Sequence, residues 1–422
     1  MEDNSRQNLP KFFIYYMSVF PIIDVINGWL ISTGHNFPLG ICYRIFLFLL
    51  CIKLMYIVKK SSYNTLFNIY LLNALVFGIL VVIQAIYFNN SLNDIISDGG
   101  SIVKYLLLFL ICIIFLEYQV SIKRFLTFIL CINFFLIAGL WIPYIFKVGN
   151  YTYQNSEAGF KGFYFATNDI TYAFTMFSTI ILISIVHQYT TNRYYFIKCH
   201  WGIFFLNLAS LFLISTKFGL AYLLLMIFYI VYNFIFFNER VNARLKFLFV
   251  YLVIASIIFI VVVGHSYIFQ HLSNLFSRIS YFYYYYDGNW IDVLTSSRSI
   301  YLKNAIELFK EFPNSHLILW FGFGFSKRVT LFGRAGNIEM DFLDTLFSFG
   351  IIGMSLLIVT LMFLFFKIKD KGRYLFILTL VYAASSGHVF YSGMSTMIFG
   401  IVLARILKKE NNLNEDTYDW PI

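Results

Sequence analysis

The sequence has few charged residues. Of its 422 residues only 12% are Asp, Glu, Lys or Arg, whereas 60% are hydrophobic. A soluble protein contains roughly 25% charged residues, and a soluble chain of this length divides into domains joined by polar linkers, which are not visible here. The composition therefore excludes an ordinary soluble protein and indicates a chain that lies in a lipid bilayer.

Motifs for metals, disulfides and nucleotides are also missing. The five cysteines, at positions 42, 51, 112, 131 and 199, form no CxxC pair and no Cys/His cluster, so we expect five free thiols. The sequence has neither a GxxxxGK[ST] phosphate loop nor a GxGxxG that follows a strand. These absences argue against ATP-driven and dinucleotide-dependent chemistry, and we predict no cofactor and no metal.

Long apolar runs recur from Phe12 almost to the C-terminus. Each must be helical, because lipid offers the backbone no hydrogen-bond partners. We therefore predict an all-α integral membrane protein with about 12 transmembrane helices. The predicted spans are residues 12–32, 41–58, 66–88, 102–117, 125–146, 168–187, 201–215, 218–237, 247–264, 342–366, 374–386 and 389–406.

Lys and Arg gather at the termini and in the even-numbered turns between these spans. The short loops on the opposite side contain only Lys147, Lys161 and Lys217. Because basic residues accumulate in short cytoplasmic loops, both termini are predicted to be cytoplasmic. The net charge of +10 reflects this topology and affinity for anionic lipid headgroups, so it gives no argument for nucleic-acid binding.

The helical pattern breaks between residues 265 and 340, which we expect on the outer side. The chain thus divides into helices 1–9 (1–264), an outer loop (265–340), helices 10–12 (341–406) and a cytoplasmic tail (407–422). Loops of this length are usually functional or disordered. This one contains an aromatic run at 281–286 and helical spacing from Arg298 to Phe312, ended by Pro313. We predict a large, partly helical loop that covers the outer surface as a lid.

Ionisable residues near the spans are the next signal, because they are costly in hydrocarbon and mark substrate paths. Arg44, Lys104 and Lys217 are expected near the outer ends of their helices, below the loop. Cations at one depth under a lid suit an anionic headgroup, and the planar fork of arginine matches phosphate oxygens. The plain alternative is that each side chain snorkels to the headgroups or forms a structural ion pair.

Five short segments follow one another along the chain: Gly162 to Asn168, Ser215-Thr-Lys217, Ser297-Arg298, Glu339 to Gly353, and Gly387-His388. In this order they resemble one known family, the O-antigen polymerase and O-antigen ligase superfamily (Wzy- and WaaL-type membrane glycosyltransferases). The resemblance covers nearly the whole chain in architecture, but the motifs are short. Two residues depart from the ligase pattern: Lys217 stands where many ligases have arginine, and Glu339 stands where they have a loop histidine. The second departure favours a polymerase.

The resemblance implies a protein of the bacterial cytoplasmic (inner or plasma) membrane that polymerises a surface polysaccharide of the O-antigen or capsule type. A glycan on undecaprenyl diphosphate would be transferred to a sugar hydroxyl of another lipid-linked repeat unit, without nucleotide or metal. The implied partners are the undecaprenyl-diphosphate-linked oligosaccharide and membrane lipids, with a chain-length regulator and a flippase as further candidates. Such a reaction needs positioning, cations on the leaving diphosphate, and a base.

Binding roles follow from the same resemblance. Arg44, Lys217 and Arg298 are the candidates for the diphosphate. Asn168 and Tyr284 are the candidates for glycan contacts. The alternatives are that Asn168 caps the sixth helix and that Tyr284 belongs to an aromatic belt at the membrane interface.

The catalytic candidates are Arg298, Glu339, Asp341 and His388. Glu339 or Asp341 is expected to act as the base, with His388 as a further possibility. Two residues apart on a helix, the two carboxylates would point about 200° apart, so one of them faces the site. The alternative is that these acids occupy the start of the tenth helix, where the helix dipole favours negative charge.

Two other functions stay open. A ligase would transfer finished glycan to a different acceptor. A polysaccharide flippase or transporter would show paired repeats and interrupted helices with charges near the membrane midplane. We see neither feature in the sequence, which favours the enzyme.

Overall fold

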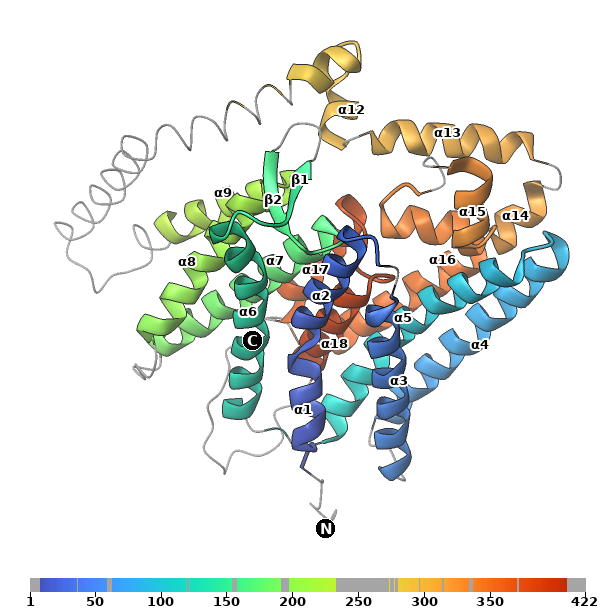
Figure 1. Ribbon diagram of the computed structural model, residues 1–422. Helices are drawn as coiled ribbons and strands as arrows, with labels where there is room; N and C mark the ends of the chain where they lie inside the picture. Colours follow the sequence, from blue (N-terminus) through green and yellow to red (C-terminus); the bar gives the residue numbers. More distant parts are fainter. Residues whose placement is uncertain are drawn as a thin grey trace.

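The computed structural model describes residues 8–35, 37–58, 63–118, 120, 122–153, 158–190, 197–232, 273, 277, 280–295, 297–312, 315–333, 337–369 and 372–407. The described chain is mostly helical, with one two-stranded antiparallel sheet, β1 (Asn150–Tyr153) and β2 (Ala158–Gly162) (Figure 1). The N-terminal helices are α1 (Lys11–Ser18), α2 (Phe20–Ser32), α3 (Leu39–Ile57), α4 (Asn64–Tyr87), α5 (Leu92–Glu117), α6 (Ile122–Ile145), α7 (Thr167–Thr190), α8 (Ile197–Ile214) and α9 (Lys217–Tyr232). The later helices are α12 (Trp290–Thr295), α13 (Arg298–Glu311), α14 (Ser315–Phe321), α15 (Phe325–Phe332), α16 (Asp341–Lys367), α17 (Arg373–Ser385) and α18 (Gly393–Leu407).

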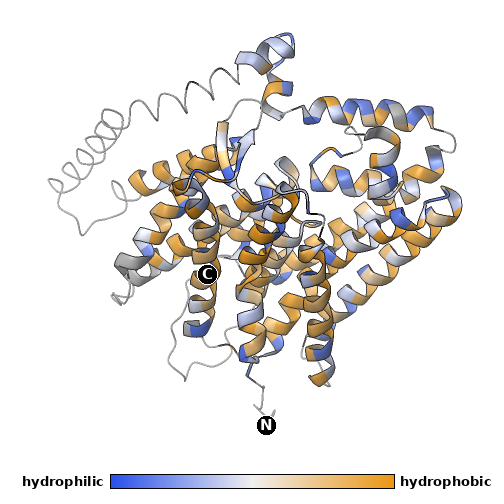
Figure 2. Cartoon of the chain, viewed as in Figure 1, coloured by the Kyte–Doolittle hydropathy of each residue, from blue (hydrophilic) through white to orange (hydrophobic). Residues whose placement is uncertain are grey.

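Among the described residues, seven segments are long and apolar enough to cross a membrane: α1 with α2, α3, α4, α5, α6, α7 and α16. Four shorter apolar helices, from α8, α9, α17 and α18, lie where further spans are predicted. Hydrophobic residues cover these helices, whereas polar residues are frequent on α13 (Figure 2). The predicted all-α membrane class is therefore confirmed. The ninth predicted span, residues 247–264, lies outside the described residues, so the number of twelve spans stays a prediction.

Helices α5 and α18 form the centre of the bundle. Nearly every residue of α5 from Tyr105 onward is buried, and the same is true of most of α18. The two helices run in parallel, because Tyr391, just before α18, stacks on Tyr105 and Gly400 lies directly against the carbonyl of Leu108. Small residues at such crossings let helix backbones approach closely in a bilayer.

The first helix begins, and the last helix ends, on the same side of the bundle. Phe13 of α1 packs on Phe115 near the end of α5, with ring centroids 6.0 Å apart. Since α18 runs parallel to α5, its end at Leu407 lies at this side as well. The opposite side holds β1, β2, α12 and α13 (Figure 1). Which side faces the cytoplasm stays a prediction from the Lys and Arg pattern.

One helix is longer than predicted. The span expected at 102–117 begins at Leu92, because Ser91 and Asp94 form a capping box there. Lys104 therefore lies near the middle of α5 and not at its outer end, which corrects the sequence-based placement. The polar residues of the added turns face α15: Ser326 donates its N–H to Asp98 and its hydroxyl to Asp94, both at 2.8 Å.

The outer loop is partly helical, as predicted. The helix expected from Arg298 to Phe312 is α13, which ends one residue earlier at Glu311. Helices α14 and α15 follow and pack on α16, α4 and α5. Two features were not predicted: the hairpin of β1 and β2 between α6 and α7, and a break inside α16 at Gly350, where φ is 66°.

Candidate functional site

The site is built around the turn between α17 and α18. Asp341, the first residue of α16, accepts backbone N–H groups from His388 at 2.7 Å, Val389 at 2.7 Å and Phe390 at 3.2 Å. Gly387 and His388 both have positive φ, 66° and 64°, which lets three successive N–H groups point at one carboxylate. Asp341 is buried and thereby fixes the turn that carries His388.

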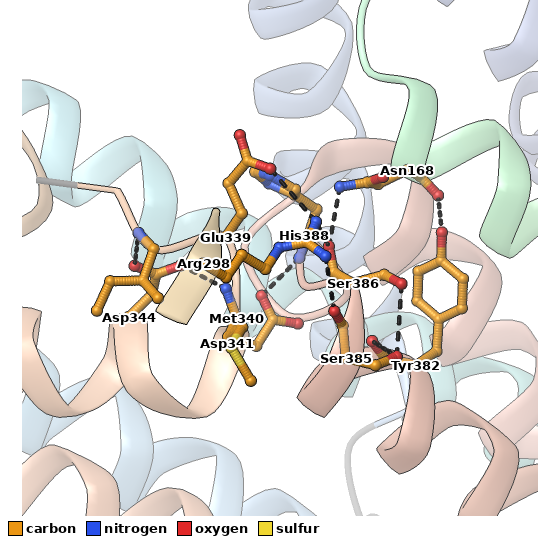
Figure 3. Close-up of polar contacts among 11 residues, drawn as sticks. Asn168, Arg298, Glu339, Met340, Asp341, Asp344, Tyr382, Ser385, Ser386 and His388 are labelled. Carbon is orange, nitrogen blue, oxygen red and sulfur yellow. Dashed lines mark hydrogen bonds and ion pairs between the residues drawn. The ribbon is translucent and has the colours of Figure 1, made fainter. Parts of the chain in front are cut away.

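Arg298 joins the loop helix α13 to this turn (Figure 3). Its Nη1 donates to the Ser385 carbonyl at 2.8 Å, and its Nη2 donates to the Ser386 carbonyl at 3.4 Å and pairs with Glu339 Oε2 at 3.3 Å. The side chain of Arg298 is 13% exposed, whereas that of Glu339 is 46% exposed. Arg298 Nε is buried and has no hydrogen-bond partner among the described residues. The pair thus presents an accessible carboxylate beside an arginine whose Nε–H has no acceptor among the described residues.

Asn168 reaches the same turn from α7. Its side-chain Nδ2 donates to the Ser386 carbonyl at 2.8 Å, the same carbonyl that Arg298 contacts, and its backbone carbonyl accepts the Tyr382 hydroxyl at 2.6 Å (Figure 3). Asn168 lies inside the first turn of α7, which begins at Thr167. The nitrogen of the side-chain amide therefore fastens α7 to the turn.

Asp169, the next residue, was missed in the sequence. It accepts hydroxyl hydrogen bonds from Ser392 and, at 3.0 Å, from Ser395. His388, which is half-buried, has Asp169 and Asp341 as its charged neighbours. The only available signal was an acid at a helix start, which helix capping explains equally well. The turn is thus held between two carboxylates from α7 and α16.

Arg44 lies beside the first residue of α18. Its Nη2 contacts both carboxylate oxygens of Asp24, at 2.7 and 2.9 Å, and its Nη1 donates to the Gly40 carbonyl at 3.0 Å. Asp24, whose role could not be assigned from the sequence, is therefore the partner of Arg44. Arg44 Nε is buried without a partner in the described structure. The charges of Asp24, Asp169 and Arg44 also act on Lys104, so Lys104 belongs to the same charged region as Arg44.

Lys217 and Tyr284 occupy other places. The ammonium group of Lys217 donates to the Val293 carbonyl of α12, which ties the outer loop to α9. Tyr284 is 78% exposed on the loop, and no described contact joins it to Arg298. The tyrosine that does reach α13 is Tyr286, whose hydroxyl hydrogen-bonds the hydroxyl of Ser297.

Arg328 and Asp344 form a structural ion pair apart from the turn. Arg328 Nη2 lies 2.6 Å from Asp344 Oδ1, and the arginine side chain is only 2% exposed. Asp344 also accepts the N–H groups of Ile338 and Met340. Only the Nη atoms of Arg328 are paired; its Nε, like those of Arg298 and Arg44, is buried without an acceptor among the described residues.

Within the described ranges, no three His, Cys, Asp or Glu side chains lie together in a way that could hold a metal ion. Four of the cysteines, at 42, 51, 112 and 131, are free, and Cys199 is outside the described side chains.

Comparison with known proteins finds no match, either to a protein-family model or to a curated protein. The fold defines an all-α multi-pass membrane protein. Its polar centre consists of a turn between the last two helices, clamped by buried carboxylates and covered by the Arg298–Glu339 pair.

Proposed function

We propose that the protein is a polymerase of a bacterial surface polysaccharide. It transfers a glycan from undecaprenyl diphosphate to a sugar hydroxyl of a second lipid-linked repeat unit, on the outer side of the cytoplasmic membrane. The observation that carries the proposal is the pairing of Arg298, on the outer loop, with the accessible carboxylate of Glu339 above the clamped turn. A lipid-linked substrate can reach such a site from the bilayer, while an acceptor sugar can reach it from water.

Positive groups with spare donors support a diphosphate ligand. The Nε atoms of Arg298 and Arg44 are both buried without acceptors in the described chain, and Lys104 lies near Arg44. A buried donor without an acceptor costs about 1–3 kcal/mol. A diphosphate supplies several strong acceptors and negative charge. Lys217 acts in this proposal mainly by holding α12 over the site.

We assign Glu339 as the base, because its carboxylate is accessible beside Arg298. The acceptor hydroxyl oxygen forms a bond to the anomeric carbon of the donor glycan and gives its proton to Glu339. The bond from that carbon to the diphosphate oxygen breaks, and its electron pair leaves with the lipid diphosphate. When Arg298 turns to this diphosphate, Glu339 loses its partner and becomes free to take the proton.

The other two catalytic candidates receive different roles. Asp341 accepts three backbone N–H groups and is buried, so it positions the turn and does not act as the base. His388 faces Asp169 and Asp341, and we assign it to the acceptor sugar. Asn168 positions the Ser386 carbonyl behind Arg298.

The test is a reconstituted assay. Purified protein in lipid vesicles, with EDTA present, is given a lipid-diphosphate-linked repeat unit of the host polysaccharide. We expect a ladder of longer lipid-linked glycans from the wild type and a loss of about 100-fold or more in rate for Arg298→Ala, as for removal of one charge-stabilising donor. Lys303→Ala, an exposed residue on the same helix, is the matched control and should keep the ladder.

Two results would contradict the polymerase. Transfer of the whole glycan to a non-repeat acceptor, without a ladder, would identify a ligase. Movement of the unextended substrate across the bilayer, without any new glycosidic bond, would identify a flippase.

A further inference from the structure

A second polar centre lies against α15. It is separate from the Arg298 site and has no part in the proposed polymerase reaction. Gln84 of α4 is 0% exposed. Its Nε2 donates to the Phe321 carbonyl at 2.6 Å and to the Ser348 carbonyl at 2.8 Å. Because both partners are backbone carbonyls, the amide cannot be reversed, and Oε1 must be an acceptor. Oε1 is buried and has no donor among the described residues.

The carboxyl group of Asp98 borders the same small space. A Cβ atom placed on Gly324 would lie 2.2 Å from Asp98 Oδ2 and 3.1 Å from Gln84 Oε1. The other oxygen, Oδ1, accepts the N–H of Ser326 at 2.8 Å. Asp98 is 1% exposed. Gln84 Oε1 and Asp98 Oδ2 thus both lie against Gly324, and Gln84 Oε1 lacks a hydrogen-bond donor among the described residues.

Few charged groups surround Asp98. Asp94 lies one turn earlier on α5 and accepts the hydroxyls of Ser91 and Ser326. Arg328 of α15 is the cation that faces Asp98, but its guanidinium is paired with Asp344. The backbone N–H of Phe325 also faces the carboxyl. A negative charge on Asp98 would therefore be buried beside a second carboxylate, with the local arginine already engaged.

We propose that Asp98 is a proton-binding site and that its carboxyl O–H donates to Gln84 Oε1. The proton satisfies both oxygens and leaves the Asp98 side chain neutral, while Oδ1 continues to accept the Ser326 N–H. The hydrogen bond joins α5 to α4 directly under the turn that carries α15. It is therefore a proton-dependent latch for the segment from α14 to α15. The latch is complete when Asp98 is protonated and weakens as rising pH removes the proton, because the two oxygens then repel one another.

Infrared spectroscopy on the full-length protein in lipid nanodiscs tests the proton directly. We expect a carbonyl-stretch band of a protonated carboxylic acid that disappears in Asp98→Asn and is lost from the wild type on raising the pH. Asp94→Asn is the matched control and should keep the band, because Asp94 has hydroxyl donors of its own. Gln84→Met, which removes the acceptor, should shift the band to higher frequency, so the proposal stays testable if Asp98→Asn does not fold.

Hydrogen exchange of residues 322–332 tests the latch. After correction for the intrinsic pH dependence, exchange in the wild type should rise at least about threefold between pH 6 and pH 9, while Asp98→Asn should show no such rise. The reason is that the side-chain amide in Asp98→Asn donates a hydrogen bond to Gln84 Oε1 at every pH. A wild type without the carboxylic-acid band would overturn the proposal. Protection that follows the Na⁺ or Ca²⁺ concentration instead of pH would overturn it too, since a metal ion would then join the two oxygens.

Discussion

At the scale of single residues, two neighbouring acids have opposite environments. The carboxylate of Glu339 is accessible and, among the described residues, pairs with Arg298, whereas Asp341 is buried and accepts three N–H groups. Both residues were singled out in the sequence as alternatives for one role. The proposed division into a reacting group and a positioning group depends on the α17–α18 turn, which lies nearly 50 residues further along the chain. Sequence spacing within one helix cannot reveal a partner at that distance.

Substitutions at these two acids should separate activity from stability. Glu339→Gln should lower the rate of polymerisation strongly and leave the melting temperature nearly unchanged, because the side chain is half-exposed. Asp341→Asn should lower the free energy of unfolding by about 1.5–3 kcal/mol, the range for hydrogen bonds to a charged group. The reconstituted assay and thermal unfolding in the same lipid measure the two effects.

The opposite pattern would reassign the base. If Asp341→Asn kept full stability but lost activity, and Glu339→Gln stayed active, Asp341 would be the reacting group.

At the scale of helices, the sequence predicted most elements but few of their contacts. Apolar runs located the apolar helices that the structure describes, and helical spacing located α13 to within one residue. The Arg44–Asp24 pair between α2 and α3, and the pairing of Asp169 with α18, are tertiary contacts. Each charged residue alone is equally compatible with snorkelling to the lipid headgroups. The sequence therefore could not distinguish a snorkelling side chain from one that belongs to a binding site.

The contact of α3 with α18 gives a test at this scale. A Cβ on Gly393 would lie 1.8 Å from Arg44 Nε, so Gly393→Ala should push the guanidinium away from Asp24. We expect a destabilisation of about 1–3 kcal/mol, as in other overpacked cores, together with a loss of polymerisation. Gly78→Ala on α4 is the control, because a Cβ there meets nothing within 4 Å, and it should be neutral or slightly stabilising.

Thermal unfolding and the glycan ladder measure both variants. Equal stability and activity of Gly393→Ala and Gly78→Ala would show that the close approach of Arg44 to α18 does not matter in the membrane.

At the scale of the whole molecule, the proposal depends on which side of the membrane holds α13. The structure places α13 opposite the beginning of α1 and the end of α18 (Figure 1), and the basic residues predict that those ends are cytoplasmic. A lipid-linked glycan that is polymerised outside the cell can meet Arg298 only if α13 lies on the outer side. If α13 lies on the cytoplasmic side, the proposed reaction is therefore excluded.

Cysteine labelling decides this orientation. In a variant whose five native cysteines are replaced, Glu307→Cys on α13 should react with a membrane-impermeant maleimide in intact spheroplasts. Lys369→Cys, between α16 and α17, should react only after the membrane is opened, because α16 crosses the bilayer between the two positions. Labelling of Lys369→Cys from outside, with Glu307→Cys protected, would reverse the topology. The Arg298 site would then face the cytoplasm, where a polymerase of exported glycan has no substrate.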